Sequence, residues 1–129
     1  MSDALNLYNE TQKAGLDGRE LEASVLMKSA FMLKECQERW DEPGLFWRLD
    51  EALTFNQNVW TFFQAEVSQP DSPLPKPLRE QLLQLSLFID KRILDAMSDP
   101  KREKLDILID INRNIAAGLR GSPSDQPTA

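Results

Sequence analysis

The sequence predicts an all-α fold, a small antiparallel helical bundle of about five helices. Apolar residues recur at spacings of three and four along most of the chain, and no segment alternates apolar and polar residues as a half-buried strand does. Glycine or proline marks several of the breaks between these segments. At 129 residues, 41% of them hydrophobic, the chain can form one core but not two. We therefore expect one helical domain over residues 1–121.

The first two predicted helices cover residues 3–14 and about 17–40. The first is short and amphipathic. The second begins at Asp17, a residue type that suits the N-cap, and Glu20 follows three residues later as in a capping box. The second helix is broken by the sequence Asp-Glu-Pro-Gly at residues 41–44.

The third and fourth predicted helices run from about Leu45 to Ser68 and from about Lys76 to Ser98. Between them, residues 69–77 contain four prolines, which forbid a continuous helix and make a stiff connector. A fifth helix is predicted over about residues 101–120. The polar, proline-containing residues 122–129 cannot bury apolar surface, so we expect them to form a disordered C-terminal tail.

Two asparagines interrupt apolar stripes on these helices. Asn112 falls at the centre of the stripe on the fifth helix, and Asn56 interrupts the stripe on the third helix one turn before Trp60. A buried amide without a partner costs ~1–3 kcal/mol, so each side chain needs hydrogen bonds. Either the two amides pair inside the bundle and fix the register of its helices, which we favour, or they are donors in a binding groove.

The third, fourth and fifth predicted helices also carry a second apolar stripe. A helix that is apolar on two sides is usually central in its fold, but so small a bundle has no room for three central helices. Some apolar surface should therefore be exposed, as it often is where proteins bind partners. Trp60 is expected in the core. Trp47 lies off the main stripe beside a Pro-Gly corner, so it either caps the loop or meets a partner.

The composition argues against an enzyme. Histidine is absent, which removes the commonest general base and the commonest zinc ligand, and no phosphate-binding loop, Gly-x-Ser-x-Gly or Cys-x-x-Cys motif occurs. We expect no catalytic, metal or cofactor site. The lone Cys36 lies among apolar residues and is expected to be an inert core thiol.

Charge and hydropathy restrict the partners. The net charge of −6 makes direct binding of nucleic acid an unlikely role, since such proteins normally carry a basic surface. No segment approaches the ~20 apolar residues that cross a bilayer, and the N-terminus lacks the basic and apolar regions of a secretory signal. We therefore expect a cytoplasmic protein that does not enter membranes.

Three segments in this order resemble one protein family. They are Leu49 to Leu53 continuing through Asn56 and Trp60; Pro73-Leu74-Pro75 followed by Leu78-Arg79; and Leu105 through Ile109, Asn112-Arg113 and Ile115 to Leu119. The chain resembles the alphaproteobacterial flagellar biosynthesis regulatory protein FlaF family over about residues 4–121. It departs from the family pattern at Gln57, where a basic residue is frequent.

The resemblance implies a non-enzymatic cytoplasmic protein required for flagellin synthesis and secretion, acting opposite the regulator FlbT. It also implies a flagellin export chaperone, and a helical bundle with surplus apolar stripes is suited to holding an amphipathic terminal helix of flagellin in a groove. The alternative is a post-transcriptional regulator of flagellin mRNA that acts through FlbT or by direct RNA contact. The candidate partner-binding residues are Trp47, Asn56, Val59, Phe62, Leu87, Ile111, Asn112 and Asn114.

Overall fold

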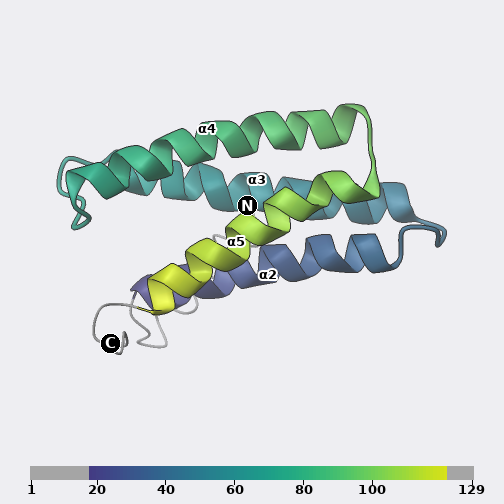
Figure 1. The fold of residues 1–129 in the computed structure, drawn as a ribbon, viewed down its shortest axis with the longest axis horizontal. Coiled ribbons are helices and arrows are strands. Elements are labelled where there is room, and N and C mark those ends of the chain that lie inside the picture. Colours follow the sequence, from purple (N-terminus) through teal and green to yellow (C-terminus); the bar gives the residue numbers. More distant parts are fainter. Residues whose placement is uncertain (1–17, 122–129) are drawn as a thin grey trace.

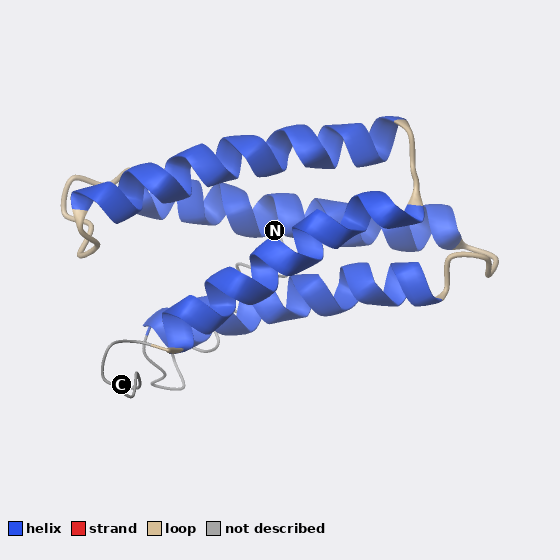
Figure 2. Cartoon of the chain, in the orientation of Figure 1, coloured by secondary structure: helices blue, strands red, loops and turns tan. Residues whose placement is uncertain are grey.

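The computed structural model describes residues 18–121, and in this part of the chain the predicted all-α fold is confirmed (Figures 1 and 2). The described residues form four α-helices and one short 3₁₀ helix, with no strand among them. These correspond to four of the five predicted helices. The predicted helix over residues 3–14, the Asp17 N-cap and the predicted tail at 122–129 lie outside the described residues.

The helices follow one another in alternating directions. They are α2 (Gly18–Glu38), α3 (Leu45–Val67), α4 (Lys76–Ser98), the 3₁₀ helix η1 (Arg102–Leu105) and α5 (Asp106–Arg120). α2 packs against both α3 and α5, while α4 packs mainly against α3. In Figure 1, α5 crosses diagonally in front of α3 towards the N-terminal end of α2, so that α4 and α5 diverge from their common corner.

The ends of the helices follow from local chemistry. Gly44 adopts the left-handed conformation, with φ 85°, immediately before α3. The Arg48 guanidinium donates hydrogen bonds to the backbone oxygens of Arg39 (2.6 Å) and Pro43 (2.6 Å), which fixes the corner between α2 and α3. Because these carbonyls belong to a turn, α2 ends at Glu38, two residues before the predicted end.

The fifth predicted helix begins differently from the expectation. Residues Arg102–Leu105 form a 3₁₀ turn, and α5 proper starts at Asp106 rather than near Lys101. Short 3₁₀ turns are frequent at helix N-termini. Here the tighter turn lies at the corner where the chain leaves α4 and crosses the bundle.

One hydrophobic core joins all of the helices. Its largest fully buried apolar side chains come from α2, α3, α4, η1 and α5: Leu26, Leu33, Leu53, Trp60, Ile89, Ile93, Leu105 and Leu108. Trp60 is 1% exposed, which confirms its prediction as a core residue. The second apolar stripe of α4 is not packed on a second side, because Leu87 and Leu94 are 56% and 60% exposed. Surplus apolar surface is therefore present, as predicted.

Candidate functional site

Four polar side chains form a buried hydrogen-bond network that ties α2, α3 and α5 together. The Asn112 amide nitrogen donates to the Asn56 amide oxygen (2.6 Å) and to the Ser29 hydroxyl oxygen (3.2 Å). The Ser29 hydroxyl donates to the same Asn56 oxygen (2.7 Å), and the Trp60 indole N–H donates to the Asn112 oxygen (2.8 Å). All four residues are at most 1% exposed.

The indole fixes the orientation of both amides. The Trp60 N–H can only donate, so it must face the Asn112 oxygen, and the Asn112 NH₂ group must then face the Asn56 oxygen. This leaves the Asn56 Nδ2 atom buried with no hydrogen-bond partner among the described residues. An unsatisfied buried donor costs about 1–3 kcal/mol, so the network trades some stability for a defined arrangement of three helices.

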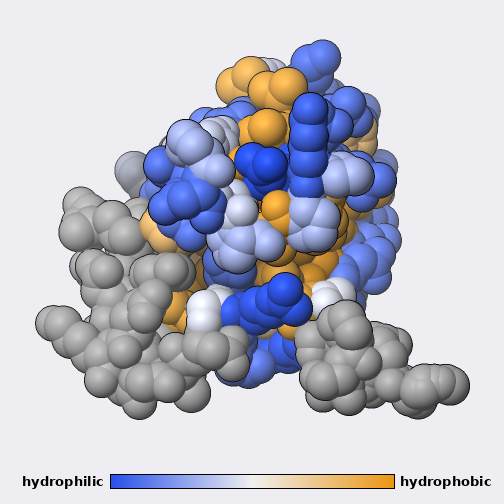
Figure 3. All heavy atoms as spheres, turned by 90° about the vertical axis from the view of Figure 1, so that its left-hand side faces the viewer, coloured by the Kyte–Doolittle hydropathy of each residue, from blue (hydrophilic) through white to orange (hydrophobic). Residues whose placement is uncertain are grey.

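Partly covered apolar side chains form one row on α4 and one row on α5, and we call these two rows together the α4–α5 face. Its members share one side of α4 or one side of α5 and are only partly covered: Leu78, Leu82, Leu85 and Phe88 on α4, and Ile107, Ile111, Ile115 and Leu119 on α5. Figure 3 looks at the end of the molecule where α3 ends and α4 begins, and hydrophobic atoms are visible at the centre of that view.

The comparison with protein families decides the identity. Residues 4–119 match the family described as flagellar protein FlaF, which is nearly the whole chain. The chain belongs to the FlaF family. No curated protein and no solved structure matches it. The resemblance seen in the sequence is therefore confirmed, and the flagellar context of this FlaF protein is established.

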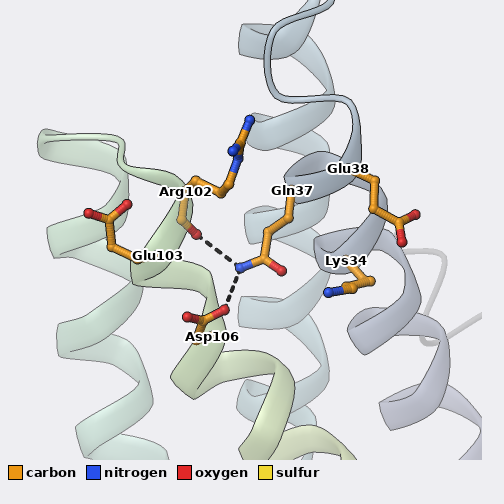
Figure 4. A pocket seen from close by; sticks show the side chains of 6 residues that line it. All are labelled: Lys34, Gln37, Glu38, Arg102, Glu103 and Asp106. Carbon is orange, nitrogen blue, oxygen red and sulfur yellow. Dashed lines mark hydrogen bonds between the residues drawn. The ribbon is translucent and has the colours of Figure 1, made fainter.

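A polar pocket lies at the other end of the molecule, at the corner of α2 and η1 (Figure 4). It measures about 260 Å³ and is lined by Lys34, Gln37, Glu38, Arg102, Glu103 and Asp106. The Gln37 amide donates to the Arg102 carbonyl oxygen (3.0 Å) and the Asp106 carboxylate (2.7 Å), which anchors η1 on α2. Since charges of both signs line this pocket, its lining favours no particular class of ligand.

Three of the predicted partner-binding residues are buried in this FlaF chain. Asn56, Val59 and Asn112 are 0%, 1% and 1% exposed, so their side chains do not reach a partner on the surface of this conformation. The two asparagines instead pair inside the bundle, which is the alternative that the sequence analysis favoured. They are therefore not groove donors in this conformation, because both side chains are buried and the Asn112 amide nitrogen already donates to Asn56 and Ser29.

The other five predicted residues are more accessible but are not gathered at one place. Ile111 is half-buried on the α4–α5 face, and Asn114 is exposed on α5. Leu87 lies on the outer side of α4, and Trp47 is 73% exposed in the first turn of α3, with its ring centroid 5.4 Å from that of Phe46. Phe62 is half-buried, and its ring lies 6.5 Å from Phe63. Their partner contacts remain predictions.

The sequence analysis missed one residue of the buried network and one residue of the α4–α5 face, although the sequence pattern indicates both. Ser29 occupies a polar position in the apolar stripe of α2 between Leu26 and Leu33, which is the same anomaly that singled out the asparagines. Phe88 is 42% exposed and belongs to the α4–α5 face, one residue from the predicted Leu87. Its position three residues after Leu85 places it on the same side of the helix.

Other chemistry is limited in the described part of the chain. Cys36 is 2% exposed, as predicted for a core thiol, and burial raises the pKa of the thiol. Among residues 18–121, no group of three or more Cys, Asp or Glu side chains is arranged to hold a metal ion. None of the helices described in this range has the length and hydropathy needed to span a bilayer.

Proposed function

We propose that this protein binds flagellin in the cytoplasm before export and acts without catalysis, as a chaperone that opposes FlbT. Membership of the FlaF family supports the flagellar context. The partly exposed apolar side chains of the α4–α5 face are the observation that carries the proposal. Partly covered apolar side chains that gather on a protein surface often mark a site where a partner binds.

The proposed mechanism is capture of a helix in a groove. Terminal segments of flagellin fold into amphipathic helices on assembly, so before export they need an apolar surface to cover them. α4 and α5 diverge above the core, and an amphipathic helix laid between them would bury its apolar side against residues such as Leu82, Phe88 and Ile115. The buried amide network would hold α5 in place beneath the bound segment.

Isothermal titration of the purified chain with its cognate flagellin tests this function. Capture of an apolar helix should give a negative heat-capacity change and an affinity that is nearly insensitive to salt. Direct RNA binding would instead weaken steeply with salt, because it depends on the release of counterions. If the protein does not bind flagellin under any of these conditions, the chaperone proposal is wrong, and the alternative of regulation through FlbT or flagellin mRNA is favoured.

A matched pair of variants on α4 tests the location. Phe88→Asp places a charge on the α4–α5 face and should weaken flagellin binding at least about tenfold. Ser98→Asp adds the same charge at an exposed polar position in the last turn of α4, outside this face, and should leave the affinity unchanged. Circular dichroism checks that both variants are folded. A folded Phe88→Asp variant with normal affinity would show that flagellin does not bind at this face.

A further inference from the structure

The outer side of α4 carries a second apolar row, which we call the α4 seam. It consists of Leu83, Leu87, Asp90, Leu94 and Met97, spaced four, three, four and three residues apart. This is the spacing of the contact positions in a two-helix coiled coil. Leu87, Leu94 and Met97 are 56%, 60% and 37% exposed, while Leu83 and Asp90 are half-buried, so the described part of the chain leaves most of the seam uncovered. The seam is distinct from the α4–α5 face.

The charges at the middle of the seam are unpaired. Asp90 and Lys91 form no ion pair, although many other charged residues of the described chain do. Some of their neighbours match in pairs about the bond between them: Leu87 matches Leu94 and Phe88 matches the apolar Ile93, whereas Ile89, which is fully buried, does not match Arg92. The segment from Leu87 to Leu94 reads Leu-Phe-Ile-Asp-Lys-Arg-Ile-Leu, so that reversing it exchanges the two leucines and replaces the acid by the base.

We propose that the α4 seam is the interface between two copies of this chain, paired through antiparallel α4 helices. A two-fold axis between Asp90 and Lys91 brings Leu87 of each copy near Leu94 of the other. It also brings Asp90 of each copy near Lys91 of the other, so two identical ion pairs form at the centre. An interface of this kind must be complementary to itself, and the segment meets that condition at the Leu87–Leu94 pairs and at the Asp90–Lys91 pairs.

A second copy fits this surface better than an unrelated helix does. The acid in the middle of an apolar row would be poorly matched to a purely apolar partner, whereas Lys91 of a second copy neutralises it. A polar residue at such a position also fixes the register of paired helices. Because the α4–α5 face remains free in this arrangement, the proposal does not depend on flagellin binding.

The oligomeric state tests the proposal. Sedimentation equilibrium over a concentration series should give a mass that rises to twice that of the chain. Leu94→Asp should return the protein to a monomer, while Phe31→Asp, which adds a charge at an exposed apolar position on α2, should leave the dimer intact. If the chain stays monomeric at every concentration, the proposal is wrong, and the α4 seam does not bind a second copy.

Exchange of the central charges gives a sharper test. Asp90→Lys alone and Lys91→Asp alone each create two like-charge contacts across the axis and should weaken dimerisation about tenfold. The double variant Asp90→Lys/Lys91→Asp restores both ion pairs in reversed order and should dimerise like the parent. Single variants without effect, or a double variant weaker than either single variant, would exclude this arrangement. Flagellin titration of the same variants separates this result from failure of the chaperone proposal.

Discussion

Two asparagine side chains define the interior of this bundle. Asn56 and Asn112 sit at positions where apolar residues would be expected, and they join α3 to α5 through a 2.6 Å hydrogen bond. The arrangement is specific because each amide has distinct donor and acceptor ends, and the donor-only indole of Trp60 sets which end faces which. Apolar side chains of similar size would fill the same space without fixing the register of the helices.

A charge at Asn112 should therefore be costly. Asn112→Asp replaces the NH₂ group that faces the Asn56 oxygen with a carboxylate oxygen, and a buried charge without a partner destabilises by about 3–5 kcal/mol. Urea denaturation should show a loss of this order. Asn114→Asp makes the same change at an exposed position of α5 and should stay within about 0.5 kcal/mol. Equal losses in the two variants would contradict the network.

The sequence was sufficient to locate both asparagines but not to choose their role. Their positions within apolar stripes follow from helical periodicity, and the need for hydrogen bonds follows from burial. Whether those bonds are internal depends on how three helices cross, which no single helix encodes. Asn56 and Asn112 lie 56 positions apart in the chain, and only the packed bundle brings them together.

At the scale of elements, the helix boundaries were the most predictable property. α4 begins and ends where proline and periodicity indicated, and α3 ends within one residue of the expectation. The largest departure, the 3₁₀ turn before α5, arises at the α4–α5 corner. Local periodicity cannot distinguish a 3₁₀ turn from the first turn of an α-helix, because both place Leu105 and Leu108 on the buried side.

Two glycines should respond oppositely to alanine. Gly44 has φ 85°, and an added Cβ would lie 3.2 Å from the Arg48 guanidinium, so Gly44→Ala should destabilise by about 1–2 kcal/mol. Gly118 lies within α5, where an added Cβ meets nothing within 4 Å. Gly118→Ala should stabilise by about 0.5–1 kcal/mol, because alanine favours helix and glycine does not. Chemical denaturation of both variants measures the signs, and a stabilised Gly44→Ala would disprove the strain.

The corner after α4 should be sensitive to acid. A hydrogen bond from Lys104, with the charge of that residue and of Lys101, lowers the pKa of Asp99. A carboxylate whose pKa is lower in the folded state contributes stability above its unfolded pKa and loses it as the pH falls through the folded pKa. Asp99→Asn should therefore lower the Tm near about pH 7, and this effect should fade only as the pH falls below about 4, through the lowered pKa of Asp99.

A control for that measurement lies in the connector between α3 and α4. Asp71 is exposed and has no ion pair among the described residues, so Asp71→Asn should leave the Tm unchanged across the same pH range. If Asp99→Asn also has no effect near neutral pH, the contacts with Lys104 do not stabilise the corner.

At the scale of the whole molecule, the sequence predicted that apolar surface would remain but not where. The second stripes of α3 and α4 look alike in the sequence, yet α3 is covered by α2 and α4 while α4 packs mainly on α3. Leu87 and Ile111 were both predicted to bind partners. They lie on different surfaces, because the direction of each side chain depends on which side of its helix the core occupies. Burial of this kind is a property of the assembled bundle.

The uneven packing also predicts where the molecule opens first. α4 has four buried residues, against nine in α3, and none of residues 76–85 is buried. Segments with few buried contacts open locally at low free energy. Backbone amides of residues 76–85 should therefore exchange hydrogen at least about tenfold faster than those of α3, and the amides of residues 86–98 should exchange at intermediate rates. Hydrogen exchange followed by mass spectrometry measures this order. Equal protection of α3 and α4 would mean that the bundle opens only as one unit, and a partner would then meet a rigid surface rather than an adjustable one.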